Sequence, residues 1–194
     1  MQCPYCHTPL NENSKECPSC QLSLYAANTL LKPMPRTIRG LNDSRQVLAK
    51  GANKRITTAI TALERKFPQV DMHIMVSKFD EKFPLATHLF WLFNQGDFCA
   101  TNRKGGKNHS ILMGLDYQSG KIGLIVGYGL EPFLPMKTLD HTLERAQPLL
   151  ASGNFGMAII TVITSLSELM ESICANLHEA LGIDLGEKEV IKEF

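Results

Sequence analysis

Four cysteines near the start of the chain constrain its fold more than any other feature. Cys3, Cys6, Cys17 and Cys20 have the spacing C-x2-C-x10-C-x2-C, and the 194 residues contain six cysteines in all. Four thiolates in two close pairs are the ligand set of a closed, tetrahedral zinc site. Because so short a segment cannot bury enough apolar surface to fold alone, we expect it to fold around the ion. The sequence therefore predicts a structural zinc ribbon over residues 1–25.

The residue that follows each cysteine pair departs from the usual zinc knuckle, which has glycine there. His7 and Gln21 occupy these two positions. They are candidates for a strained backbone or for a different turn. We interpret His7 as a surface residue and not as a ligand, because the four cysteines already complete the coordination of the ion.

Charge is distributed unevenly along the chain. Residues 21–55 include seven basic side chains and one acidic side chain, whereas residues 137–194 include four basic and nine acidic ones. The whole chain has a net charge of +1, which favours no class of partner. A basic stretch can bind phosphate or an anionic surface, or it can be a solvated linker that balances the acidic tail. Pro33, Pro35 and Gly40 predict a basic linker over residues 26–40.

The sequence predicts a cytoplasmic protein that is not an integral membrane protein. Residues 1–4 have neither the basic nor the apolar part of a secretory signal. The most apolar run, residues 155–170, contains two threonines, two serines and a glutamate. This run is shorter than the roughly 20 apolar residues that a bilayer requires. In a reducing compartment, paired cysteines bind metal more often than they form structural disulfides.

Hydrophobic periodicity predicts alternating helices and strands after the linker. We expect helices over residues 51–67, 84–95, 137–150 and 154–181, and strands over 69–79, 110–116 and 121–128. Pro84 suits the first turn of a helix, and Gly120 marks a hairpin turn. This order predicts an α/β fold, a three-layer α/β/α sandwich with a small mixed sheet. It would occupy residues 41–194, including a C-terminal helical extension.

Four segments of the chain match one known family in order and spacing. They are residues 84–96, 108–116, 121–135 and 148–158, and the most specific piece is VGYGLE at residues 126–131. Over about residues 41–172 the chain resembles the TPM domain. The resemblance implies a three-layer α/β/α fold. It also implies functions that range from acid phosphatase, through binding of calcium or other divalent ions by acidic residues, to non-catalytic assistance of membrane complexes.

Two positions that are usually acidic in this family are altered. Lys107-Asn108-His109 stands where the family usually has Asp-Asn-Gly, and Met136 stands where an Asp usually follows Leu-Pro. The remaining candidates for a ligand cleft, or for a divalent ion such as Ca²⁺ or Mg²⁺, are Asp43, Asn108, Asp116 and Glu131. The loop over residues 96–109, which contains two adjacent glycines, also offers candidates for anion binding. The alternative is that it is simply an exposed loop. These candidates are Arg103, Lys104, Lys107 and His109.

Three functions follow as hypotheses. We expect a non-catalytic interaction or assembly module with a protein partner, because two family acids are missing and no nucleophile constellation is readable. One alternative is a phosphatase-like hydrolase acting on phosphomonoesters, which rests on family analogy. The other is a nucleic-acid-binding protein that acts through the ribbon and the basic linker. We also expect Gly127 and Gly129 to serve backbone packing at the end of a strand.

Overall fold

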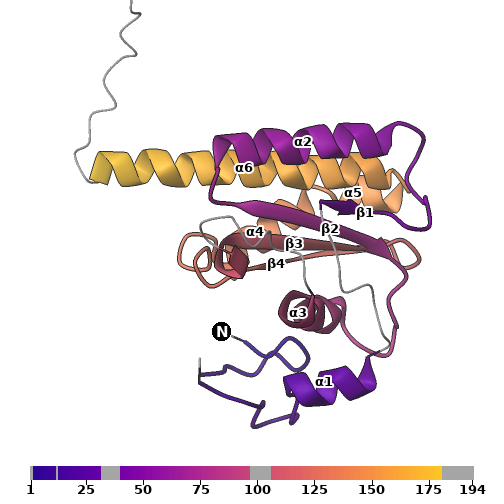
Figure 1. The fold of residues 1–194 in the computed structure, drawn as a ribbon, viewed down its shortest axis with the longest axis vertical. Coiled ribbons are helices and arrows are strands. Elements are labelled where there is room, and N and C mark those ends of the chain that lie inside the picture. Colours follow the sequence, from indigo (N-terminus) through magenta and orange to yellow (C-terminus); the bar gives the residue numbers. More distant parts are fainter. Residues whose placement is uncertain (1, 12, 32–39, 97–105, 181–194) are drawn as a thin grey trace, which may run out of the picture.

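A four-stranded sheet lies between two layers of helices (Figure 1). The structure is a computed structural model that describes residues 2–11, 13–31, 40–96 and 106–180, with side chains up to residue 176. Strands β1 (Leu41–Asn42), β2 (Asp71–Ser77) and β3 (Ser110–Asp116) are parallel to one another. Strand β4 (Lys121–Val126) is antiparallel to β3. The prediction of a three-layer α/β/α sandwich with a small mixed sheet is therefore confirmed.

One face of the sheet carries the larger hydrophobic core. The helices on this face are α2 (Ala52–Lys66), α4 (Met136–Glu144), α5 (Gln147–Ala151) and α6 (Phe155–Ala180). Helix α2 contributes Ile56, Ile60 and Leu63, which recur every three or four residues as the side chains on one helix face do. Helix α6 contributes Ile159 and Val162, both fully buried. The apolar periodicity of the sequence therefore predicted both helices at these positions in the chain.

The opposite face of the sheet is covered by α3 (Leu85–Gln95), and α1 (Leu24–Leu30) packs on α3 farther from the sheet. Gly114 and Gly123 form a cross-strand pair beneath α3. A Cβ added to Gly114 would lie 2.4 Å from Leu89 Cδ2, so the two glycines allow α3 to approach the sheet closely. The small core on this face consists of Ala27, Leu31, Met75, Phe79, Leu89, Trp91, Leu92 and Leu112.

Helix α1 occupies the beginning of the segment that we predicted as a basic linker over residues 26–40. Ser23 caps the helix by accepting a hydrogen bond of 3.1 Å from the Ala26 N–H. Ala27 and Leu31 are buried in the small core. The residues up to Leu31 therefore belong to the fold, because their apolar side chains pack on α3. Residues 32–39 of the predicted linker lie outside the described residues.

The C-terminal part of the chain differs from the prediction in the number of helices and in the length of its apolar run, whereas α6 has nearly the predicted bounds. Residues 137–150 form two helices, α4 and α5, since Pro148 has no N–H with which to continue the first helix. Helix α6 runs on to Ala180, so its segment Phe155–Asn176, with a mean hydropathy of 1.5, is long and apolar enough to cross a membrane. We expected the apolar run to end at residue 170 and therefore to be too short, but it continues to Asn176. Within the protein, 39% of this segment is buried, where it packs into the large core.

Candidate functional site

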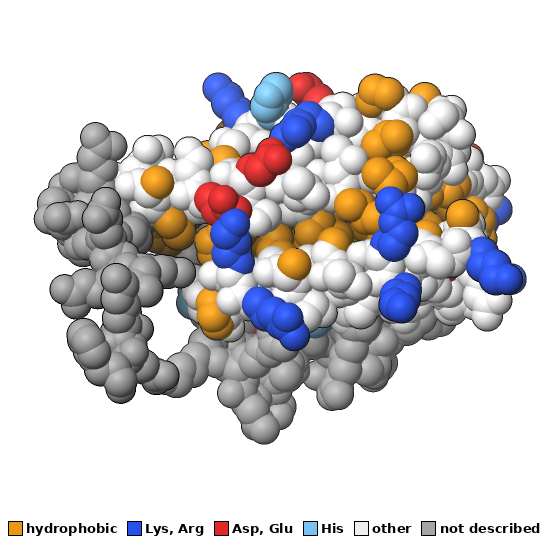
Figure 2. All heavy atoms as spheres, turned by 90° about the horizontal axis from the view of Figure 1, so that it is seen from above, with side chains coloured by type: hydrophobic (Ala, Val, Ile, Leu, Met, Phe, Trp, Pro, Cys, Tyr) orange, Lys and Arg blue, Asp and Glu red, His pale blue; other side chains and the backbone are white. Residues whose placement is uncertain are grey.

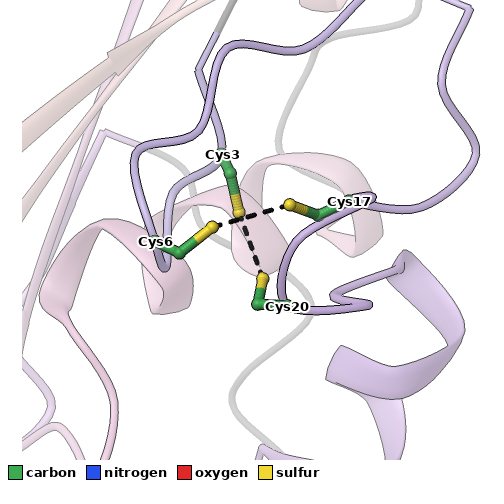
Figure 3. A group of neighbouring side chains, drawn as sticks. All are labelled: Cys3, Cys6, Cys17 and Cys20. Carbon is green, nitrogen blue, oxygen red and sulfur yellow. Dashed lines mark hydrogen bonds between the residues drawn. The ribbon is translucent and has the colours of Figure 1, made fainter.

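The four N-terminal cysteines converge on one point (Figure 3). The Sγ atoms of Cys3 and Cys20 are 3.6 Å apart, and those of Cys6 and Cys17 are 3.5 Å apart. All four sulfurs lie within 4.8 Å of one another, so they could hold a metal ion. Within the described part of the chain, no other group of three or more His, Cys, Asp or Glu side chains is placed to do so.

Both cysteine pairs form the same turn. Around the first pair, the Cys3 N–H donates to the Thr8 carbonyl at 2.9 Å, and the His7 N–H donates to the Cys3 carbonyl at 3.0 Å. The second pair repeats these bonds, with Cys17 donating to Leu22 and Gln21 donating to Cys17, each at 2.9 Å. The module is therefore two copies of one local structure that face each other.

The residue after each cysteine pair has a left-handed backbone. His7 has φ of 58° and Gln21 has φ of 57°, a region in which a side chain costs about 1 kcal/mol. These positions are where the usual knuckle has glycine, and their strain is as expected from the sequence. The side chain of His7 is exposed, in agreement with its interpretation as a surface residue.

The cysteine thiols differ in acidity because their surroundings differ. The hydroxyl of Thr8 lies 3.2 Å from Cys6 Sγ. Hydrogen bonds from this hydroxyl and from the Thr8 backbone lower the pKa of Cys6 to about 6, whereas burial raises the pKa of Cys20 to about 12. Metal binding must therefore displace protons from thiols of the cluster. Since protons compete with the ion for thiolates, metal affinity should fall as the pH is lowered.

Residues 2–23, which we call the cysteine module, dock on α3. The Thr87 hydroxyl donates to the Pro4 carbonyl at 3.1 Å, and the rings of Tyr5 and Phe83 have centroids 6.4 Å apart. Helix α1 adds a hydrogen bond of 2.6 Å from Trp91 Nε1 to Asn28 Oδ1. Thr87 and Trp91 are buried as a result. The N-terminal segment and α3 thus share one interface, and the module is not an independent appendage.

The four predicted ligand-cleft residues lie in two separate pairs. Asp43 follows β1 and Asp116 ends β3, so both are at the carboxyl ends of the parallel strands. Asn108 and the turn that contains Glu131 lie at the other end of β3, because Gly127 bonds to Ser110 and Gly129 bonds to Asn108. A strand of this length separates the two ends by roughly 20 Å. The structure therefore does not bring the four residues together.

The two aspartates of this set serve local turns. The Asp43 carboxylate accepts hydrogen bonds of 3.0 Å from the N–H groups of Val47 and Leu48. The Asp116 carboxylate accepts from the Gln118 N–H at 3.0 Å and from the Ser119 hydroxyl at 2.7 Å, within the β3–β4 turn. These bonds occupy oxygen atoms that a divalent ion would need.

The altered family motifs meet in what we call the motif junction, residues 107–109 and 127–131. The Gly129 N–H donates to the Asn108 carbonyl at 2.9 Å. A Cβ added to Gly127 would lie 2.1 Å from the Lys107 carbonyl oxygen, and one added to Gly129 would lie 2.5 Å from His109 Nε2. The prediction that these glycines serve close backbone packing is confirmed.

The predicted anion-binding loop can be placed only in part. Arg103 and Lys104 lie outside the described residues. Lys107 Nζ donates to the Asn94 carbonyl near the end of α3 at 3.2 Å, and His109 packs against Gly129. Both residues therefore make contacts within the protein that compete with a bound anion.

Three exposed hydrophobic side chains lie in the motif junction and in the segment that directly follows it. Tyr128, Phe133 and Met136 are 57%, 47% and 61% exposed, although Leu130 and Leu134 between them are buried and anchor the turn. The other large hydrophobic side chains exposed in the described residues all belong to the cysteine module or α1. This patch was not predicted from the sequence, because a single alternation of exposed and buried apolar residues in a turn carries little signal.

A surface hollow that contains none of the predicted site residues lies at the carboxyl ends of β2 and β3. It has a volume of about 530 Å³ and is lined by Lys78, Phe79, Asp80, Glu81, Lys82, His88 and Gln118. His88 is held by contact of its Nε2 with the Asp80 carbonyl at 3.0 Å and by packing on Phe79, with ring centroids 5.3 Å apart. The alternation of aromatic and charged residues directly after a buried strand is the signal that could have located it.

Comparison with known proteins identifies the larger part of the chain. The family model described as the TPM domain matches residues 41–169. The solution NMR structure of the N-terminal domain of a protein from P. gingivalis has a TM-score of 0.52 and 17% identity, covering 70% of this chain and 83% of that one. The NMR structure of the BA42 protein from the psychrophilic bacterium Bizionia argentinensis has a TM-score of 0.50 and 16% identity, covering 65% and 83%. Likeness at these identities concerns the fold alone. No curated protein sequence matched the chain.

Proposed function

Because the chain belongs to the TPM domain family, we propose that it is a non-catalytic interaction module whose N-terminal cysteines bind one structural zinc ion. The observation that carries this proposal is the exposed patch of Tyr128, Phe133 and Met136 beside the motif junction. Aromatic and methionine side chains are enriched at the centres of protein interfaces. The patch is therefore the surface that we assign to a protein partner.

Zinc is the ion that suits the cysteine module. A tetrahedral zinc ion with Zn–S bonds of about 2.3 Å separates its sulfur ligands by about 3.8 Å. The separations of 3.5 and 3.6 Å in the two cysteine contacts are close to this value. Four cysteines leave no coordination position for water, so the ion stabilises the module and takes part in no reaction. The reducing cytoplasm, which we propose as the compartment, keeps the thiols available.

The motif junction favours binding over hydrolysis. A hydrolase that uses a divalent ion needs several oxygen ligands at one point. Here a lysine and a histidine stand at positions 107 and 109, and the backbone between the motifs is closely packed. The carboxylates of Asp43 and Asp116 are engaged in turns at the other end of the sheet.

Site-specific photo-crosslinking tests the proposed partner surface. We would place a photoreactive phenylalanine analogue at Phe133 of the full-length protein in cells, and at Lys121 as a control. Lys121 is also exposed, but it lies at the opposite end of β4 from the motif junction. We expect a discrete crosslinked protein at position 133 that the Tyr128→Ser substitution weakens. Crosslinks of equal yield at both positions, or none at position 133, would contradict the proposal.

Metal analysis and a hydrolysis assay test the rest of the proposal. Protein purified in metal-free buffer should contain one zinc ion per chain and no second ion. We expect no hydrolysis of phosphomonoesters with added Mg²⁺, Ca²⁺ or Zn²⁺. Hydrolysis that the Glu131→Ala substitution abolishes would replace our proposal with the phosphatase-like alternative.

A further inference from the structure

The outer face of α2 carries a row of basic and hydroxyl side chains. Its exposed residues recur every three or four positions, opposite the buried face of the helix: Lys54, Thr58, Thr61 and Arg65. Lys50 and Arg55 flank the N-terminal end of the row. We call these six residues the α2 stripe. From position 50 to position 65 it extends about 22 Å along the helix axis.

The basic residues of the stripe differ from those elsewhere on this face. Lys66 pairs with Glu171 of α6, and Arg145 pairs with Glu168 at 2.8 Å. Among the described residues, no carboxylate forms an ion pair with the four basic residues of the stripe. Figure 2 shows this face from above: acidic side chains accompany the basic ones over its left part, whereas the basic side chains on the right stand largely apart from them. The stripe is therefore a source of uncompensated positive charge.

The beginning of α2 adds to this positive potential. The helix is preceded by Gly51, which offers no side-chain cap, and its first turn contains no acidic residue. The N-terminal N–H groups of a helix carry a partial positive charge, which acidic residues normally offset. Lys50 and Lys54 flank this helix end, so the charges reinforce one another.

The side chains between the cations indicate what kind of anion fits. A helix that binds a lipid surface combines its cations with large apolar side chains on the same face. None of the exposed large hydrophobic residues of the described chain lies on α2. The stripe instead interleaves its cations with Thr58 and Thr61, whose hydroxyls donate to the Lys54 and Thr57 carbonyls at 2.9 Å. The face is thus polar, and its lysine and arginine side chains are the usual partners of nucleic-acid phosphates. A linear row of cations also matches a linear array of phosphates better than a folded acidic protein.

We propose that the α2 stripe binds the phosphate backbone of a nucleic acid, without reading its base sequence. This surface is not the one that the sequence suggested. The cysteine module lies on the far side of the sheet from α2 (Figure 1), so the ribbon and the stripe cannot contact the same short stretch of nucleic acid. Of the seven basic residues in positions 21–55, Lys50, Lys54 and Arg55 belong to the stripe.

Fluorescence anisotropy with the full-length, zinc-loaded protein tests the proposal. The probes are a labelled single-stranded RNA and DNA and a labelled DNA duplex, each about 20 nucleotides or base pairs long, titrated between about 50 and 200 mM salt. For contacts to four phosphates we expect a slope of log K against log salt near −3.6 on the duplex. The Lys54→Glu/Arg65→Glu variant should bind at least about tenfold more weakly. It should also make the slope less steep by about 2, because two phosphate contacts are lost.

A charge-matched control and two competing ligands make the result decisive. The Lys121→Glu/Lys137→Glu variant changes the net charge equally at exposed sites on β4 and α4, and it should alter the affinity less than about twofold. Circular dichroism confirms that both variants are folded. Undetectable binding at the lowest salt concentration, or equal weakening by both variants, overturns the proposal. Binding to phosphatidylserine vesicles or to polyglutamate as tight as to nucleic acid also overturns it.

Discussion

On one face of the sheet, α2, α4, α5 and α6 enclose a core with 25 buried hydrophobic residues, whereas the core under α3 on the other face has eight among the described residues. The smaller core takes Ala27 and Leu31 from the N-terminal segment, which the cysteine module holds against α3. A core of this size buries too little apolar surface to keep α1 and the cysteine module packed on α3 without a further interaction. We therefore propose that hydrophobic burial is the main stabilising interaction on the first face, and that metal binding by the cysteine module has this role on the second.

Removal of the metal should separate the two faces most clearly. Cys17→Ser, or a chelator, should unfold the cysteine module, because zinc binding supplies about 10 kcal/mol or more to the folding of such modules. Trp91 is the only tryptophan and is bonded to Asn28 of α1. Its fluorescence should shift to longer wavelength and become open to acrylamide quenching, while hydrogen exchange in α6 stays slow.

Cys174→Ser is the matched control for this experiment. Cys174 lies on α6, half-buried against the large core and outside the cysteine cluster. This variant should keep the metal and the emission of Trp91. Unchanged Trp91 emission after removal of the metal would mean that the packing of α1 and the cysteine module on α3 does not depend on the ion. That result would contradict the proposed difference between the two faces.

Truncation of a side chain in the large core should have the opposite signature. Ile159 is fully buried in α6, and Ile159→Ala should lower the free energy of unfolding by about 2–5 kcal/mol. Metal content and Trp91 emission should be unchanged until the whole domain unfolds in denaturant. Ile160→Ala, at the half-buried next position, should cost clearly less. A loss of metal in Ile159→Ala before global unfolding would show that the two faces are coupled.

Substitution of Gly129 tests the packing at the motif junction. The added Cβ of Gly129→Ala would lie 2.5 Å from His109 Nε2, so we expect a destabilisation of about 1–3 kcal/mol. Thermal unfolding of the single and double variants measures it. Because the clash is with a side chain, His109→Ala in the same chain should recover part of the loss. A double variant as unstable as the sum of the single variants would mean that the strain lies elsewhere.

The smallest expected effect concerns the two strained positions of the cysteine module. His7→Gly and Gln21→Gly should each stabilise the metal-bound module by about 1 kcal/mol, since glycine adopts a left-handed backbone without strain. Because folding and metal binding are coupled, the zinc affinity should rise about fivefold in competition with a chelator. Asn13→Gly is the control, as Asn13 does not have a positive φ. An unchanged affinity would show that the module tolerates the strain without cost.

Local patterns in the sequence carried much of the prediction. The cysteine spacing identified four residues that the structure brings within 4.8 Å of one another, because each pair lies in a turn of its own. The periodicity of residues 51–67 predicted α2, and the apolar pattern of three further segments predicted β2, β3 and β4, whereas the two-residue strand β1 was not predicted. Helix α1 and the break between α4 and α5 were missed, since short helices depend more on packing than on their own periodicity.

The sequence by itself determined the four members of the cysteine cluster, the order of the larger helices and strands, and the family of the chain. Only the tertiary structure decided which distant residues meet. It separated Asp43 and Asp116 from Asn108 and Glu131, packed Gly127 and Gly129 on residues 107–109, and placed the cysteine module and α2 on opposite sides of the sheet. The reason is physical: ligand spacing and periodicity act over a few residues, whereas these contacts follow from strand pairing and helix packing between segments far apart in the chain.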